Sequence, residues 1–195
     1  RGFKLVNYFK KKIFTKKECD MILSMPIKMV REKDVINDLG LEFETSWANG
    51  VANSNWDQNY QEVLQAEDWV WDRLEKYKNI YSKHANSFWP LFIRTYGVGD
   101  QLGIHQDGSK EIRRTAISIN LNEDFEGGEF QIFDWELNYS GKEITHKPTH
   151  GIKTFKPEAG VMIQVPLYVP HGVTPVIKGV RKQLLTWTLG DKINW

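Results

Sequence analysis

Two residue types that bind metal ions well lie close together in one short segment. His105 and Asp107 are separated by a single residue. Because side chains alternate along an extended chain, residues two apart point to the same side and can approach one ion. A third candidate ligand, His171, follows a proline far along the sequence. Two imidazoles and one carboxylate form the facial ligand set that suits ferrous iron and leaves coordination positions open.

Arg181, ten residues after His171, indicates what could fill those positions. A guanidinium stays charged and presents parallel N–H donors, which match a carboxylate. Arg181, Gln183, Leu185 and Trp187 lie at even spacing, so in a strand they share one face and Trp187 can form a wall of the same pocket. Lys182 would point the other way. Arg181 is therefore the predicted anchor for a dicarboxylate cosubstrate.

These motifs, in this order, resemble the Fe(II)/2-oxoglutarate-dependent dioxygenases, and among them the prolyl 4-hydroxylase-like branch. The resemblance runs from Leu91 to Trp187. It implies Fe(II), 2-oxoglutarate and O2 as the cofactor and cosubstrates, with ascorbate as a candidate reductant. It also implies a role for each site residue: His105, Asp107 and His171 as metal ligands and catalytic centre, and Tyr96, Arg181 and Trp187 as the residues that bind 2-oxoglutarate.

Three further positions bear on this resemblance. Gly97 to Asp100 predicts a hairpin turn that brings Tyr96 beside the strand carrying His105. Gly127-Gly128 is similar to the glycine pair with which the family enters a strand, where glycine permits close backbone approach to the cavity. Asn120 departs from the pattern, because the branch commonly has a cosubstrate-contacting tyrosine there.

The activity implied by the resemblance is hydroxylation of an unactivated C–H bond, with succinate and CO2 as coproducts. The implied substrate is a prolyl residue of a peptide or protein. Two alternatives remain open: an oxidative nucleic-acid demethylase of the same superfamily, and a metal-binding jelly-roll module without turnover. The formal net charge of +1 and the lack of an evident base-stacking platform argue against a nucleic-acid partner.

Composition predicts a folded protein that works in a reducing compartment. The 195 residues suffice for one domain, in which we expect residues 1–90 to supply helical support and N-terminal strands and residues 91–195 to supply the core with the iron site. A single cysteine, Cys19, cannot form an internal disulfide or a cysteine-rich zinc site. No apolar run is long enough to cross a bilayer. We therefore expect a cytoplasmic protein without a membrane partner.

The predicted elements give a mainly β fold with an α-helical flank and a double-stranded β-helix (jelly-roll) core. Residues 1–12 predict an edge strand, and the capping-box spacing of Thr15 and Glu18 predicts a helix over 16–25. Apolar periodicity predicts a second helix over 58–81. Between them, residues 28–56 predict short strands joined by a loop. The expected core strands are 91–96, 115–121, 129–133, 161–165, 173–177 and 183–189, with a loop over 138–151 that includes His146 and His150.

Overall fold

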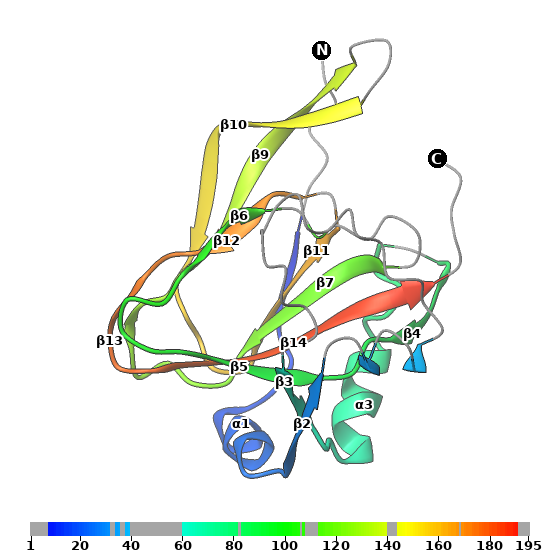
Figure 1. Cartoon of the computed structure of the whole chain (residues 1–195), viewed down its shortest axis with the longest axis vertical. Helices are drawn as coiled ribbons and strands as arrows, with labels where there is room; N and C mark the ends of the chain where they lie inside the picture. The colour runs from blue at the N-terminus through cyan, green and yellow to red at the C-terminus, as the bar shows by residue number, and fades with distance from the viewer. Residues whose placement is uncertain are drawn as a thin grey trace.

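A computed structural model gives the arrangement of most of the chain (Figure 1). It describes residues 8–31, 34–35, 38–39, 60–81, 83–105, 107, 113–139, 144–167 and 169–190. Most of the segment 40–59 therefore lies outside the described residues, including the loop expected there. Within the described part, strands dominate and two helices flank them.

The larger of the sheets has eight strands, and every pairing in it is antiparallel. Its order across the sheet is β1 (Phe9–Lys12), β11 (Val161–Pro166), β7 (Arg113–Asn120), β14 (Arg181–Gly190), β5 (Phe92–Tyr96), β3 (Tyr60–Leu64) and β2 (Ile27–Arg31), with β4 (Ala85–Phe88) also paired to β14. β1 stands at one edge, as the sequence predicts, and its lysines help to protect that edge from pairing with another chain.

A smaller, four-stranded sheet faces the large one (Figure 1). It runs β10 (Ile144–Phe155), β9 (Phe130–Tyr139), β12 (His171–Val173) and β6 (Leu102–His105). A two-stranded pair, β8 (Glu126–Gly127) with β13 (Val176–Lys178), lies at one end. Two facing antiparallel sheets with strands exchanged along the chain form the predicted double-stranded β-helix.

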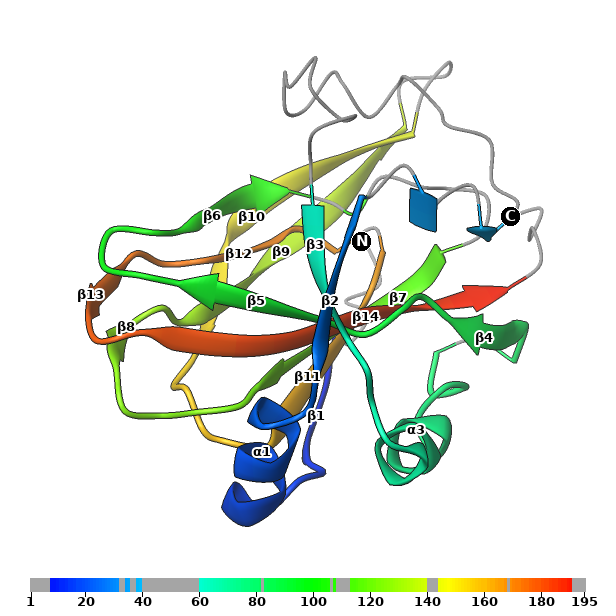
Figure 2. The same ribbon diagram turned by 60° about the horizontal axis from the view of Figure 1, so that its bottom comes forward.

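Both described helices lie on the side of the large sheet that faces away from the small one (Figure 2). Helix α1 (Lys16–Leu23) begins with the predicted capping box: the hydroxyl of Thr15 accepts from the N–H of Glu18, whose carboxylate accepts from the N–H of Thr15. The second helix, α3 (Asp68–Glu75), buries Val70 and Leu74. Their apolar faces pack with one face of the large sheet.

β14 separates two hydrophobic cores. Leu184 belongs to the core under the helices, whereas Leu185 and Trp187 belong to the core between the two sheets. In β5, Ile93 likewise faces the helices and Phe92 and Tyr96 face the interior between the sheets. The alternation predicted from even spacing is therefore present, and it directs one set of β14 side chains into the barrel.

The single helix predicted over 58–81 is wrong. Tyr60–Leu64 form β3, which pairs with β2 and β5, and the helix covers only Asp68–Glu75. Val63 and Leu64 match a helical stripe in the sequence, but three cross-strand partners in sheet pairing outweigh that local preference. Helix α1 also ends two residues earlier than predicted, at Leu23.

One loop prediction and one strand prediction are also wrong. The expected loop over 138–151 falls largely within β9 and β10, which form one long antiparallel ladder with a register shift between Pro148 and Ile152. Backbone pairing along that ladder compensates for the turn-forming residues, and the irregularity accommodates them. The expected strand 173–177 is split into β12 and β13, which pair with different partners.

The turn at Gly97 to Asp100 is present, but it does not form the expected hairpin. The N–H of Asp100 donates to the Gly97 carbonyl, and the N–H of Gly97 donates to the Asp100 carboxylate. β5 and β6 on its two sides belong to different sheets. The turn therefore carries the chain across the barrel, which places Tyr96 and His105 on facing sheets.

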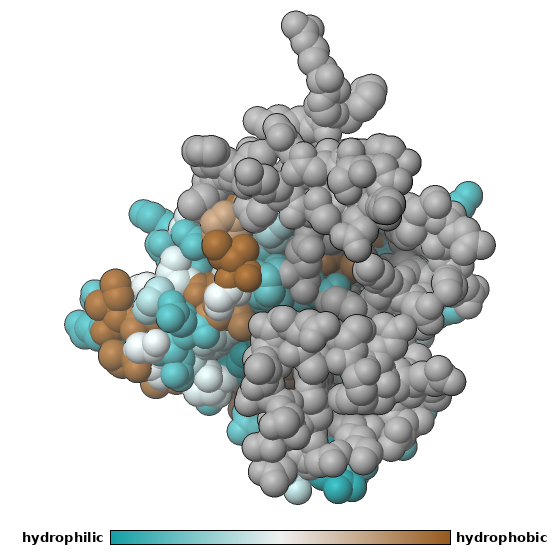
Figure 3. All heavy atoms as spheres, turned by 45° about the horizontal axis from the view of Figure 1, so that its top comes forward, coloured by the Kyte–Doolittle hydropathy of each residue, from teal (hydrophilic) through white to brown (hydrophobic). Residues whose placement is uncertain are grey.

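Exposed apolar side chains gather at the end of the barrel where β13 lies (Figure 3). Ile177 and Val98 are each 68% exposed. The N–H of Gly99 donates to the Val176 carbonyl, which joins the turn that carries Val98 to β13. None of the helices among the described residues has both the length and the apolar character that crossing a bilayer requires.

Candidate metal centre

Strand register brings the two candidate histidines together. His171 of β12 lies directly opposite His105 of β6 in an antiparallel pair, so both side chains project from the same face. Their ring centroids are 4.5 Å apart. Asp107 lies two residues beyond His105, and its N–H donates to the carbonyl of Leu167. This backbone bond holds the end of the β6 segment at the histidine pair.

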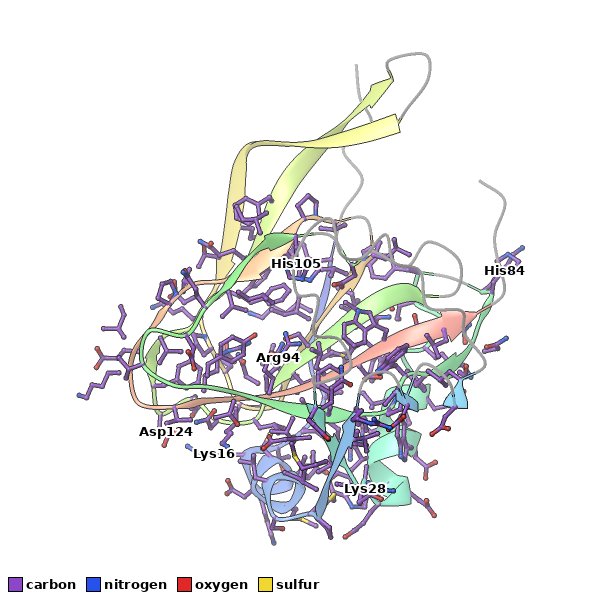
Figure 4. The ribbon with its side chains drawn as sticks, in the orientation of Figure 1. Lys16, Lys28, His84, Arg94, His105 and Asp124 are labelled. Atoms are coloured by element: carbon purple, nitrogen blue, oxygen red, sulfur yellow. The ribbon has the colours of Figure 1, made fainter. Side chains whose placement is uncertain are left out.

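The three side chains converge on one point in the interior. Asp107 Oδ1 lies 3.4 Å from His105 Nε2, and Asp107 Oδ2 lies 3.5 Å from His171 Nε2. One ligand atom from each residue lies within 4.8 Å of the others. Asp107 and His171 are buried, while the His105 side chain is 33% exposed. His105, which is labelled in Figure 4, is therefore the most exposed of the three candidate ligands.

Backbone carbonyls orient both imidazole rings. His105 Nδ1 donates to the Gly103 carbonyl at 2.8 Å, and His171 Nδ1 donates to the Val169 carbonyl at 2.9 Å. A ring nitrogen that faces a carbonyl oxygen must carry the proton, so each Nε2 keeps its lone pair for a metal ion. The ring of Phe130 stacks on His171 with a centroid separation of 5.6 Å.

Asp107 is prepared to bind as a carboxylate. Burial raises its pKa, but the charges and hydrogen bonds of His171, His105 and Trp187 outweigh burial and hold the pKa below its usual range. Trp187 Nε1 donates to Asp107 Oδ2 at 3.1 Å. Trp187 comes from the large sheet, so this bond crosses the barrel to fix a candidate ligand that follows the small sheet.

A second polar group lies in the same interior around Arg181. Register pairs Arg181 of β14 with Tyr96 of β5, and the guanidinium carbon lies 4.9 Å from the tyrosine ring centroid. Arg181 is fully buried, and only its Nη1 has a hydrogen bond among the described residues, to Gln183 Oε1. Its Nε and Nη2, and the hydroxyl of Tyr96, have no such partner. Burial lowers the pKa of Arg181 to about 10.

Gln183 extends this polar group toward β7. Its Nε2 donates to Ser118 Oγ at 2.5 Å, and register pairs it with Asn120. Asn120 is buried, and its Oδ1 has no hydrogen-bond partner among the described residues. The position that departs from the family pattern thus supplies an amide on the strand next to Arg181.

The donor set fits the metal and cosubstrate that the sequence predicts. Two neutral imidazoles and a carboxylate suit a divalent ion such as Fe(II). Nε and Nη2 of Arg181 form one edge of the guanidinium, which can hold a carboxylate by two parallel hydrogen bonds. Leaving a buried cation without an anion costs several kcal/mol, so the pocket favours an acidic ligand.

The structure brings the six predicted site residues into one interior. Lys182, in contrast, points outward and donates to Thr95 Oγ1.

Two features of the site were not predicted from the sequence. Sequence reasoning assigned Trp187 to the pocket wall without its bond to Asp107, which depends on the facing of two sheets. Arg94 was the second. It lies two residues before Tyr96 in a strand, and this spacing could have indicated that both side chains share one face. His146 and His150 lie on β10, within the ladder that β10 forms with β9.

Comparisons with known proteins agree with this arrangement. A model of the 2OG-Fe(II) oxygenase superfamily matches residues 91–189. A PKHD-type hydroxylase of Paraburkholderia xenovorans is 32% identical over 114 residues, which are 55% of this chain and 46% of that protein. A PKHD-type hydroxylase of Klebsiella pneumoniae is 35% identical over 98 residues, 50% of this chain and 42% of that protein.

Solved structures share the fold. A 2OG-Fe(II) oxygenase family oxidoreductase from Burkholderia pseudomallei has a TM-score of 0.58 at 15% identity, covering 96% of this chain and 87% of its own. A Pseudomonas putida prolyl-4-hydroxylase has a TM-score of 0.51 at 18% identity, and the match covers 92% of this chain and 93% of that protein. The chain spans about half the length of the curated relatives it matches. It belongs to the 2OG-Fe(II) oxygenase superfamily.

Proposed function

We propose that this protein is an Fe(II)- and 2-oxoglutarate-dependent dioxygenase that hydroxylates a C–H bond. His105, Asp107 and His171 would hold the iron, and Arg181 would bind the distal carboxylate of 2-oxoglutarate. The observation that carries this proposal is the buried edge of Arg181, whose Nε and Nη2 have no hydrogen-bond partner among the described residues and which lies in the same interior as three convergent metal ligands. A structural metal site alone would not need a buried guanidinium with one free edge in that part of the structure.

When bound, Fe(II) together with 2-oxoglutarate supplies O2 activation, in which one oxygen atom enters the substrate C–H bond and the other enters succinate as CO2 is released. The protein positions the reacting groups and excludes competing reactions. Arg181 and Tyr96 set the direction of the cosubstrate from the large sheet, while Trp187 fixes Asp107. Phe130 and Phe92 line the same interior and limit the access of water.

The proposed substrate is a prolyl residue of a peptide or protein. Support comes from the superfamily to which the chain belongs and from its likeness in fold to a Pseudomonas putida prolyl-4-hydroxylase and to a viral collagen prolyl hydroxylase. His105 is the most exposed of the three ligands, so a peptide segment can reach the centre from that side. We also propose Asn120 as a contact to 2-oxoglutarate, in place of the tyrosine that is usual in the branch.

The anchoring role of Arg181 is tested by calorimetric titration of 2-oxoglutarate into the Mn(II)-loaded protein. Arg181→Leu removes two charge-assisted hydrogen bonds, so we expect the Kd to rise about 100-fold while Mn(II) affinity is kept. Lys182→Leu removes a neighbouring cation that faces outward, and should leave the Kd for 2-oxoglutarate unchanged. A larger effect from Lys182→Leu would transfer the anchor to that residue.

Substrate and turnover need a separate experiment. The Fe(II)-loaded protein is incubated with 2-oxoglutarate, O2 and a panel of prolyl peptides, with ascorbate as a candidate reductant, and succinate and peptide mass are followed. We expect one succinate for each gain of one oxygen atom on a proline. Equivalent oxidation of methylated nucleobases instead would favour the demethylase alternative. Tight metal and 2-oxoglutarate binding without any succinate would favour a module without turnover.

A further inference from the structure

Arg94 contributes a second cation to the barrel interior. It lies on β5 between Phe92 and Tyr96, both of which belong to the core between the sheets. Register pairs Arg94 with Gln183 of β14, which faces that interior and bonds to Arg181. Residues opposite each other in an antiparallel pair project from the same face. Arg94 therefore faces the interior between the sheets, and Figure 4 places it there, below His105.

The charge of Arg94 has no acidic partner among the described residues. Its guanidinium lies 5.7 Å from the ring centroid of Phe92, and no hydrogen bond or ion pair to the rest of the described chain holds it. Arg94 is half-buried, so solvent screens the charge of its guanidinium only in part. Its charge acts on both halves of the site, because it helps to lower the pKa of His171 and of Arg181, in each case after burial as the main cause.

A count of charges indicates what Arg94 could bind. Asp107 carries one negative charge, the two histidines are neutral ligands, and Arg181 carries one positive charge. A divalent ion and a dicarboxylate cancel each other, so the site with metal and cosubstrate is neutral without Arg94. Arg94 then adds one positive charge to this interior, and no acidic side chain among the described residues balances it. Such a charge favours an anionic group on the molecule that enters last.

We propose that Arg94 binds a carboxylate of the primary substrate and so selects acidic substrates for this site. The assignment rests on the proposed function, because it requires the metal and 2-oxoglutarate to occupy the interior first. The guanidinium of Arg94 lies 5.7 Å from the ring of Phe92, which packs on Trp187 at 5.5 Å, and Trp187 in turn donates to Asp107. A carboxylate held by Arg94 would therefore lie in the same interior as the metal ligands, with the rest of the substrate directed toward His105.

The test measures anion binding without turnover. The protein is loaded with Mn(II) and saturating 2-oxoglutarate, and the probe is trifluoroacetate, whose fluorine relaxation is accelerated when it binds near the paramagnetic ion. Trifluoroacetamide serves as the uncharged probe of similar shape. The variants are Arg94→Gln, which removes the charge, and Arg94→Lys, which keeps it. Lys182→Gln is the matched control, since it removes an outward-facing cation from the neighbouring strand.

We expect Mn(II)-dependent relaxation of trifluoroacetate but not of trifluoroacetamide. The effect should fall about tenfold in Arg94→Gln, because a charge-assisted hydrogen bond is worth at least that factor, and should persist in Arg94→Lys and Lys182→Gln. Displacement of trifluoroacetate by peptides distinguishes a side-chain carboxylate from a C-terminal one. A prolyl peptide with an acidic side chain and an amidated C-terminus is compared with a neutral prolyl peptide that has a free C-terminus, and the peptide that displaces the probe carries the carboxylate that Arg94 binds.

Three results would overturn the assignment. Relaxation that persists in Arg94→Gln would show that the anion binds elsewhere. A tenfold loss of 2-oxoglutarate affinity in Arg94→Gln would move Arg94 into the cosubstrate site. Failure of the unsubstituted protein to bind Mn(II) and 2-oxoglutarate would reject the proposed function itself, and this outcome is recognised before any fluorine probe is added.

Discussion

Asp107 illustrates how single contacts prepare the candidate centre. Its carboxylate is approached by the Nε2 atoms of His105 and His171 and by the indole N–H of Trp187. The two imidazoles are held by backbone carbonyls. Each candidate ligand therefore has a fixed orientation before a metal arrives, which reduces the conformational entropy lost on binding.

Replacing Trp187 by phenylalanine tests the bond that crosses the barrel. Trp187→Phe keeps an aromatic ring but removes the N–H donated to Asp107. Contacts of this kind orient metal ligands, so we expect Mn(II) affinity to fall about tenfold, measured by calorimetry. Trp69→Phe removes an indole N–H that bonds to Glu67 at the helical flank and should leave Mn(II) affinity unchanged. Equal affinities for both variants would assign Trp187 a packing role only.

At the scale of elements, β14 and the segment that precedes β9 meet at Arg181, the proposed anchor of the cosubstrate. Gly128 has a φ of +58°, a backbone region that side chains rarely adopt. A Cβ placed there would lie 3.0 Å from Cδ of Arg181, so glycine allows the chain to pass against the buried guanidinium stem. The family-like glycine pair thus has a local physical role beside Arg181.

Gly128→Ala should displace Arg181 and strain the backbone. We expect a loss of about 1–3 kcal/mol in unfolding free energy from the positive φ, and about tenfold weaker 2-oxoglutarate binding from the shifted anchor. Denaturant unfolding and calorimetry on the Mn(II)-loaded protein measure the two effects. Gly97→Ala is the control, because its added Cβ meets only Asp100 Oδ2 at 3.5 Å. Unchanged 2-oxoglutarate affinity in Gly128→Ala would contradict the close approach to Arg181.

Sequence reasoning succeeded where chemistry or strict periodicity restricts residue type. His105, Asp107 and Arg181 stand out by type and spacing; the structure brings the first two together with His171, and the alternation in β14 puts Arg181 on the same face as Gln183. Their roles stay predictions. It failed where tertiary pairing overrides local preference: Tyr60–Leu64 joined a sheet rather than a helix, and β10 continued through Pro148. The bond from Trp187 to Asp107 and the position of Arg94 depend on how two sheets face each other, which no local pattern encodes.

At the scale of the molecule, the N-terminal half completes the sheet that carries Arg181. β1 pairs with β11, and β3 pairs with β5, so strands from both halves belong to one sheet. We therefore propose that residues 1–195 form a single domain, with 1–90 supporting the core of 91–195. Coincident unfolding curves from tryptophan fluorescence and circular dichroism would support one cooperative unit, and two separated transitions would reject it.

An ion pair joins the two helices of the supporting layer. Arg73 of α3 donates to Glu18 of α1 at 2.9 Å, and Glu18 also caps its own helix. Hydrogen bonding from Arg73, followed by that from the Thr15 N–H, lowers the pKa of Glu18 below 4.5. Because the folded-state pKa is depressed, this contribution to stability is present at neutral pH and is lost as pH falls through the folded-state pKa.

Glu18→Gln should therefore destabilise the protein by about 1 kcal/mol at pH 7 and by less at pH 3. Urea unfolding of both proteins at the two pH values measures the difference. Asp20→Asn removes an exposed carboxylate from the same helix and serves as the control. A Glu18→Gln penalty that is the same at pH 3 as at pH 7 would mean that the charge of Glu18 does not contribute.

The most direct test of the oxygenase site is an anaerobic titration of the Fe(II)-loaded protein with 2-oxoglutarate, followed by visible absorption. Direct chelation of iron by the 2-oxo acid produces a charge-transfer band. We predict a saturable band that is absent in His105→Ala and that requires about 100-fold more 2-oxoglutarate in Arg181→Leu. Bound Fe(II) without any band at saturating 2-oxoglutarate would contradict the assignment of this centre as a 2-oxoglutarate-dependent oxygenase site.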